Sequence, residues 1–236
     1  MSLTRNGFQD FVNAQPAPAE AGDFAGANPR MTVRAGAGGF VAEINGVVVG
    51  RFAWGNPATG VASNANSANT LLGFVHRENQ AIIVPFLQSY VLTILAGLNV
   101  SLYSRGDFWA EFTAGAAIGA SVYTDPVTGQ ASTSSGGGNI LTPWFVATTV
   151  EVDASVTASI DGNGIMTVTA IGSGVLEKGQ YLSGTGVPNN TIIESQLTGT
   201  AGSTGTYRVN TLIPVTSTAI TATVGKLGKI STWQNM

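Results

Sequence analysis

The sequence predicts an all-β protein whose main domain is an antiparallel β-sandwich or barrel of jelly-roll type. Three observations support this fold class. Helical periodicity is almost absent, short β-branched and aromatic runs recur along the chain, and Gly, Asn, Pro and Ser separate those runs. Such short runs at regular spacing are typical of antiparallel sheets. The strongest helix-like piece, residues 7–14, is too short for more than a turn or two.

The first thirty residues, 1–30, are predicted to form an extended N-terminal arm. Pro16 and Pro18 prevent regular strand pairing and favour extended backbone. A disordered tail would rarely carry many large apolar groups in so short a stretch. The arm either wraps over its own domain or lies on a neighbouring subunit, and both alternatives remain open. Its large apolar side chains without a periodic partner are Phe8, Phe11, Val12 and Phe24.

Residues 31–152 are predicted to hold most of the first β domain. Asn45-Gly46 lies between two apolar runs and predicts a hairpin, because both residue types accept the positive φ angles of a type I′ turn. The expected strands are 31–34, 40–44, 47–54, 72–76, 82–86, 90–94, 99–103, 108–112, 121–124 and 144–152.

A second β module, residues 153–223, is indicated by a change of composition to Ser, Thr, Gly and β-branched residues. Two alternating segments, 156–160 and 165–170, flank Asp161-Gly162-Asn163-Gly164, which predicts a hairpin loop. Alternation continues in 206–210 and 218–224. The module is therefore expected to be a small β-sandwich of about six strands.

The segment after this module, KLGKISTW at 226–233, predicts one more strand. It is unlike the preceding Ser/Thr-rich text, and a terminal strand needs a sheet to join. The sequence therefore predicts that the module is inserted into the first domain, which consists of 31–152 plus 224–236. Insertion at an exposed loop is the usual way that such additions are tolerated.

Composition excludes several functions. The chain has 236 residues, no cysteine, one histidine and 10% charged residues, with a net charge of −3. A disulfide framework, a thiolate metal site and a two-His metal site within one chain are excluded. Ten basic residues spread along the sequence argue against nucleic acid as a partner. The uncharged stretch 81–103 is long enough to span a membrane, but Pro85 and its β-branched residues favour two buried strands instead.

Candidate catalytic groups are few. His76-Arg77-Glu78 joins a base, a cation and a carboxylate, and we interpret it as a hydrogen-bonded polar group at a strand end or an interface. Asp107 and Glu111 are the nearest carboxylate pair, but in a strand they would stand about 13 Å apart. The glycine-rich stretches 36–39 and 134–138 lack a phosphate-loop lysine. The sequence thus predicts no catalytic residue, no cofactor and no metal site.

Several segments resemble the structural cement proteins of tailed bacteriophages. The resemblance covers about residues 1–152 and 224–236. The segments that carry it occur in the same order: NGFQDFVNAQPAPAEAGDFAGANPR (6–30), AGAGGFVAEINGVVVGRFAW (35–54), GFVHRENQAII (73–83), GDFWAEFTAGAAIG (106–119) and KISTW (229–233).

The resemblance implies a non-enzymatic virion protein that binds the outside of an icosahedral head and ties major capsid subunits together. It implies synthesis in the host cytoplasm, a place on the capsid exterior, and the major capsid protein and further copies of itself, as dimer or trimer, as partners. No membrane partner is expected. The candidate residues for binding the capsid or a neighbouring subunit are Phe8, Phe11, Val12, Phe24, Arg30 and Trp233.

The inserted module resembles β modules of phage tail and surface proteins through GQYLSGTGVPNNTII (179–193) and LTGTAGSTGTYRV (197–209). An alternative function is therefore a tail or surface adhesin, with a host-surface glycan bound by an exposed aromatic residue such as Tyr181 or Tyr207. A hydrolase that uses His76 is a third alternative.

Overall fold

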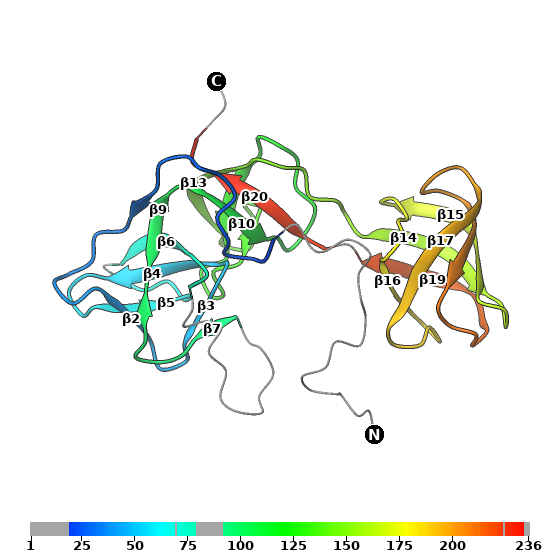
Figure 1. Ribbon diagram of the computed structural model, residues 1–236, viewed down its shortest axis with the longest axis horizontal. Helices are drawn as coiled ribbons and strands as arrows, with labels where there is room; N and C mark the ends of the chain where they lie inside the picture. Colours follow the sequence, from blue (N-terminus) through cyan, green and yellow to red (C-terminus); the bar gives the residue numbers. More distant parts are fainter. Residues whose placement is uncertain (1–18, 69, 79–91, 224, 234–236) are drawn as a thin grey trace. The chain divides into compact units, whose positions relative to one another are not determined.

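The computed structural model describes residues 19–68, 70–78, 92–223 and 225–233 (Figure 1). In these residues it contains twenty strands and no helix, which confirms the all-β prediction. No helix in the described ranges could therefore cross a membrane. Residues 82–86, part of 90–94 and the helix-like piece 7–14 lie outside the described residues.

The chain divides into two compact units. Unit 1 comprises Met1–Thr149 and Leu227–Met236, and unit 2 comprises Val150–Lys226. The strands of unit 1 are β1 (Met31–Thr32), β2 (Phe40–Ala42), β3 (Val47–Val48), β4 (Phe52–Asn56), β5 (Val61–Ser63), β6 (Leu71–Val75), β7 (Thr93–Ile94), β8 (Asn99–Val100), β9 (Leu102–Arg105), β10 (Asp107–Glu111), β11 (Ser121–Thr124), β12 (Ala131–Ser132), β13 (Ile140–Val146) and β20 (Leu227–Ser231).

Unit 1 contains two larger sheets. One has seven strands in the order β1-β9-β6-β4-β5-β2-β8, and the other has five in the order β10-β20-β13-β11-β12. β3 and β7 form a separate pair. The named strand pairs of unit 1 are antiparallel except for β2 and β5, which run parallel. The strand expected at 226–233 forms as β20, which pairs with both β10 and β13.

An aromatic core joins the two sheets of unit 1. Phe52 and Phe74 come from the seven-stranded sheet, and Phe108 and Trp144 from the five-stranded one. Ring centroids lie 5.3 Å apart between Phe52 and Trp144 and 5.0 Å apart between Phe74 and Phe108. All four side chains are fully buried. The sheets therefore hold together largely by burial of these rings, each of which removes a large apolar area from water.

The hairpin predicted at Asn45-Gly46 is wrong. A turn does form there, with the Gly46 N–H donating to the Glu43 carbonyl at 2.9 Å. Only Gly46 has a positive φ, so the turn is not type I′. The flanking strands do not pair with each other: β2 pairs with β5 and β8, and β3 pairs with β7. Burial against these distant strands outweighs the local hairpin signal.

Asn64 supplies polar contacts inside unit 1. It is buried, its Oδ1 accepts from the Val48 N–H at 2.6 Å, and its Nδ2 donates to the Phe52 carbonyl at 2.8 Å. Because Val48 and Phe52 lie at the end of β3 and the start of β4, the amide replaces the strand pairing that is interrupted there.

Replacing Asn64 with alanine is expected to lower the free energy of unfolding of unit 1 by about 2–3 kcal/mol, because the Val48 N–H and the carbonyls of Val48 and Phe52 lose a hydrogen-bond partner. Chemical denaturation measures the difference. Asn66→Ala is the matched control: its side chain is exposed and accepts only from Thr70 Oγ1, so its effect should stay within about 0.5 kcal/mol. Equal effects of the two variants would contradict the role assigned to Asn64.

Unit 2 is a closed antiparallel barrel in the order β14-β15-β18-β17-β16-β19. The expected β-sandwich is therefore wrong, although the expected six strands are present. β14 pairs with both β15 and β19, and β16 pairs with both β17 and β19, so no strand of this unit remains an open edge. The strands are β14 (Ala154–Ile160), β15 (Ile165–Ser173), β16 (Tyr181–Gly184), β17 (Thr191–Gly199), β18 (Gly205–Val209) and β19 (Val215–Thr223).

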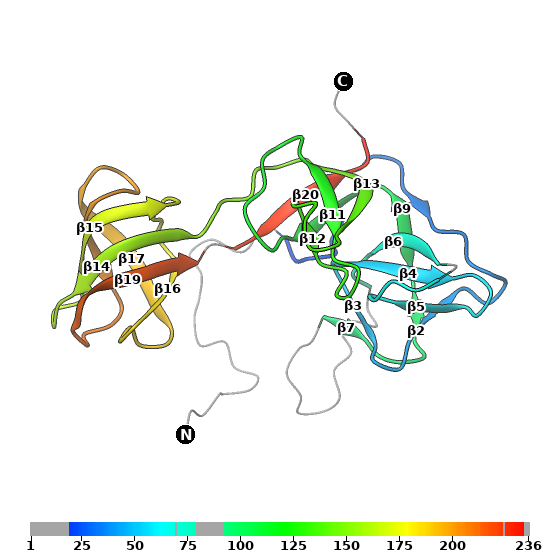
Figure 2. The same ribbon diagram turned by 180° about the vertical axis from the view of Figure 1, so that it is seen from behind.

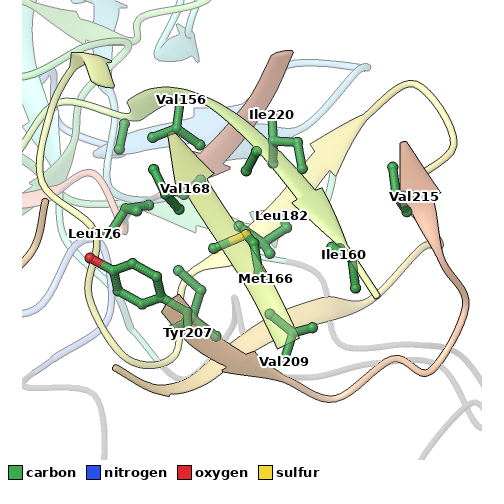
Figure 3. Packing of buried hydrophobic residues seen from close by; sticks show 14 residues of the cluster. Val156, Ile160, Met166, Val168, Leu176, Leu182, Tyr207, Val209, Val215 and Ile220 are labelled. Carbon is green, nitrogen blue, oxygen red and sulfur yellow. The ribbon is translucent and has the colours of Figure 1, made fainter. Parts of the chain in front are cut away.

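The barrel interior is filled by apolar side chains from all six strands (Figure 3). Tyr207 is among them, only 1% exposed, and its hydroxyl donates to the Ser203 carbonyl at 2.5 Å. The expectation that Tyr207 is exposed is therefore wrong, whereas Tyr181 is 55% exposed. The hairpin predicted at 161–164 joins β14 to β15, and Asp161 Oδ1 accepts from the backbone N–H groups of Asn163 and Ile165.

Candidate functional site

Residues 20–30, which we call the strap, lie along the free edge of β10. The Gly22 N–H donates to the Trp109 carbonyl at 2.8 Å, the Trp109 N–H to the Asp23 carbonyl at 2.9 Å, and the Ala25 N–H to the Asp107 carbonyl at 2.9 Å. β10 ends the five-stranded sheet, so the strap pairs with backbone that no other strand of this sheet uses. The described part of the predicted arm thus packs on its own domain.

Phe24 anchors the strap. Its ring stacks on the imidazole of His76, with 3.7 Å between centroids, and the guanidinium carbon of Arg30 lies 3.8 Å from the ring centroid. Phe108 and Tyr103 complete the surroundings at 5.5 and 5.8 Å. A cation over an aromatic face is attracted by the ring quadrupole. Phe24 therefore holds Arg30 in a defined position.

His76, the residue that follows β6, holds the strap by a hydrogen bond. Its Nδ1 lies 2.7 Å from the Gly22 carbonyl oxygen. Because a carbonyl only accepts, Nδ1 carries the proton in this contact. Burial lowers the pKa of His76, an effect that outweighs the Gly22 hydrogen bond and the nearby carboxylates of Glu78 and Asp23. The imidazole is used for structure, as predicted for a polar group at a strand end.

Arg77 and Asp23 form a second fastening. Arg77 Nε donates to Asp23 Oδ1 at 2.7 Å, and a second guanidinium nitrogen donates to Oδ2 at 3.1 Å. Burial raises the pKa of Asp23, but these hydrogen bonds, the Glu20 N–H and the charge of Arg77 together lower it overall. The carboxylate therefore stays ionised and paired at neutral pH.

The far end of the strap is held by Asp107 and by the end of β20. Asn28 Nδ2 donates to Asp107 Oδ2 at 2.6 Å, and Ser231 Oγ donates to Oδ1 of the same carboxylate at 2.6 Å. Trp233 Nε1 donates to the Pro29 carbonyl at 3.2 Å. A hollow of about 110 Å³ lies between these groups, and Lys229 also lines it. Both carboxylate oxygens of Asp107 thus accept hydrogen bonds, one from the strap and one from β20.

Three of the predicted partner-binding residues, Phe24, Arg30 and Trp233, meet at this strap. Phe8, Phe11 and Val12 lie outside the described residues. Sequence reasoning missed Asn28 and the strap-holding role of Asp107, since no local pattern links residues so distant in sequence. Glu111 is exposed on β10, and no contact joins it to Asp107 in an acid–base pair.

The glycine-rich segment 36–39 lies beside residues 57–60, around a shallow hollow of about 300 Å³. No residue lining this hollow carries a charge, so a phosphate would find no cation there. Within the described ranges, no three His, Asp or Glu side chains are grouped closely enough to hold a metal ion.

Comparison with known proteins gives a family. The model of the XM1 gp53 minor capsid protein family matches residues 8–170. No curated protein matches the chain. Among solved structures, a chain from the capsid of Myoviridae phage XM1 is 17% identical, with a TM-score of 0.44, over 60% of this chain and 89% of that one.

The family match includes the strap, the strands of unit 1 up to β13, and β14 with the first part of β15. It spans well over half of the sequence. A surface of packed backbone and aromatic groups, with its one histidine used structurally, agrees with a structural role. The chain belongs to the XM1 gp53 minor capsid protein family and is a structural component of a phage capsid, not an enzyme.

Proposed function

We propose that the chain is a cement protein, which binds the outer surface of the phage head and stabilises contacts between major capsid subunits. The observation that carries the proposal is the strap. Hydrogen bonds, an ion pair and ring stacking fix residues 22–30 on unit 1. Residues 1–18 continue from this fixed segment and include three large apolar side chains.

Physical considerations support this role. Burying Phe8, Phe11 and Val12 in a partner would each contribute about 1.5–3 kcal/mol before ordering costs. A chain with 10% charged residues carries little desolvation cost into such a contact. Many copies on one shell multiply a modest affinity through multivalency. Self-association at a capsid symmetry axis, as a dimer or trimer, is part of the proposal.

Deletion of residues 1–18, which leaves the strap in place, is expected to weaken binding to heads by at least about tenfold. Co-sedimentation with heads prepared without this chain measures the affinity. A full-length variant with Phe8, Phe11 and Val12 replaced by serine separates loss of apolar contacts from loss of length. In parallel, heads with the bound wild-type chain should rupture at a higher temperature than bare heads. Unchanged affinity would remove the arm from the proposal, and an unchanged rupture temperature would remove the cement role.

The adhesin alternative has one observation in its favour, the exposed ring of Tyr181 on β16. Aromatic faces of this kind stack on sugars. Binding of the whole chain to host-surface glycans, abolished by Tyr181→Ala, would support this second function.

A further inference from the structure

The outer edge of β1 is an open sheet edge. β1 ends the seven-stranded sheet, and β9 is its single strand partner among the described residues. Both of its residues are exposed, and Met31 keeps 54% of its surface accessible. Figures 1 and 2 show β1 as the dark blue arrow beside β9 in both views. An edge of this kind can pair with an extended segment of another chain.

Three arginines lie next to β1 in the sequence or in the sheet. Arg30 and Arg34 flank β1 in sequence, and the pairing of Met31 with Arg105 brings Arg105 beside it. All three are exposed. The two ion pairs found among the described residues involve Arg77 and Lys226, so none of the three is part of either.

Aromatic rings orient two of these arginines. Arg30 lies over Phe24 at 3.8 Å, and Arg105 lies over Trp233 at 6.0 Å. A stacked guanidinium loses less side-chain freedom when it forms hydrogen bonds, and its planar fork matches a carboxylate. Phe24 and Trp233 therefore contribute to binding indirectly, because they orient the guanidinium groups of Arg30 and Arg105.

Most nearby carboxylates are already committed. Asp23 pairs with Arg77, and Asp107 accepts from Asn28 and Ser231. Glu78 is half-buried, and its charge and that of Arg30 both act on Tyr103. Three exposed arginines around β1 make this edge positive, in a chain whose net charge is −3.

We propose that the β1 edge with Arg30, Arg34 and Arg105 receives an extended acidic segment of the major capsid protein. The inference rests on the proposed capsid binding and adds the chemistry of the partner. The ladder of β1 is irregular between Met31 and Thr32, so pairing of carboxylates with the guanidinium groups carries more of the specificity than backbone pairing. A second copy of this chain fits less well, because only 13 of its 236 residues are Asp or Glu. A nucleic acid fits less well, because three arginines make too small a basic patch for a run of phosphates.

The test uses the double variant Arg34→Glu/Arg105→Glu, which leaves Arg30 and its contact with Phe24 in place. Arg208→Glu, an exposed arginine of the barrel, is the matched control. Co-sedimentation with heads at about 0.15 M salt should show the double variant binding about 10–30-fold more weakly than wild type, with the control unchanged. At about 0.5 M salt the difference should shrink, because ions screen exposed charges.

Photo-crosslinking from a benzoylphenylalanine at position 31 then identifies the partner. The expected product is a peptide of the major capsid protein rich in Asp and Glu. A crosslink to another copy, to DNA or to a peptide without acidic residues would overturn the inference. Equal binding of the double variant and the control would also overturn it while leaving the cement role intact. If wild-type protein itself fails to bind heads, the proposed function fails as well.

Discussion

Replacing Phe108 with alanine is expected to lower the free energy of unfolding of unit 1 by about 3–5 kcal/mol. Phe108 is fully buried on β10, and its ring lies 5.0 Å from that of Phe74 and 5.2 Å from that of Tyr103. It also pairs with Ile230 of β20 and bridges to Phe24 of the strap. The substitution therefore removes packing from both sheets and from the strap at once.

The loss should extend to function. Without the ring of Phe108, Phe24 keeps His76, Arg30 and Tyr103 as neighbours but loses its contact with the five-stranded sheet. We expect faster hydrogen exchange at the N–H groups of Gly22 and Ala25, and weaker binding to heads. Denaturant titration and exchange mass spectrometry measure the two effects.

Trp109→Ala is the matched control for this prediction. Trp109 is the next residue on β10, its side chain is half-exposed, and it contacts Lys229 at 5.0 Å from the ring centroid. Its loss should lower stability by about 1 kcal/mol. Equal losses for Phe108→Ala and Trp109→Ala would contradict the assignment of the core.

Strand positions were predictable wherever the chain alternates or clusters β-branched and aromatic residues. Residues 121–124 form β11 with those bounds, and 108–112 differ from β10 by one residue at each end. The run 47–54 is instead divided into β3 and β4 around Gly50, which has a φ of +73°. Val49 between them donates to the Leu92 carbonyl. The division follows from distant pairing, which a local pattern does not contain.

Two strands of unit 1 gave no signal in the sequence. β5 (Val61–Ser63) and β12 (Ala131–Ser132) consist largely of small residues, and they are strands because β4 and β11 provide backbone partners. Ala62 and Ala131 are fully buried, where larger side chains would meet the packed core. Small residues occur at such positions because the core leaves no room for larger side chains, and they carry no signal of strand propensity.

The candidate site was predictable in its chemistry but not in its assembly. Phe24 and Arg30 were candidates in the arm, which has no regular pattern, and Trp233 was a candidate at the end of the strand expected at 226–233. Their meeting depends on pairing between the strap and β10, and on the Trp233 contact with Pro29, 204 positions away. Asp107, which holds both sides, was visible only as a carboxylate. Contacts of this range are set by the complete fold.

Replacing Tyr207 with alanine is expected to lower the free energy of unfolding of the barrel by about 3–5 kcal/mol, because the barrel loses a buried ring and its hydrogen bond. The ring is 1% exposed, and its hydroxyl donates to the Ser203 carbonyl in the β17–β18 connection. Its removal leaves a cavity and an unpartnered carbonyl. The apolar residues around it in the buried cluster all belong to unit 2 (Figure 3).

Because those neighbours all belong to unit 2, the loss of stability should be limited to unit 2. Exchange mass spectrometry should show faster exchange across β14–β19, with the sheets of unit 1 unchanged, and binding to heads should remain within about twofold of wild type. Tyr181→Ala is the control, because that ring is 55% exposed and its loss should change stability by less than about 1 kcal/mol. Loss of protection in both units after Tyr207→Ala would show that the barrel supports unit 1. Loss of head binding with unit 1 still protected would assign capsid contact to the barrel. Unchanged binding, by contrast, would assign the capsid contact to unit 1, which carries the strap and the β1 edge.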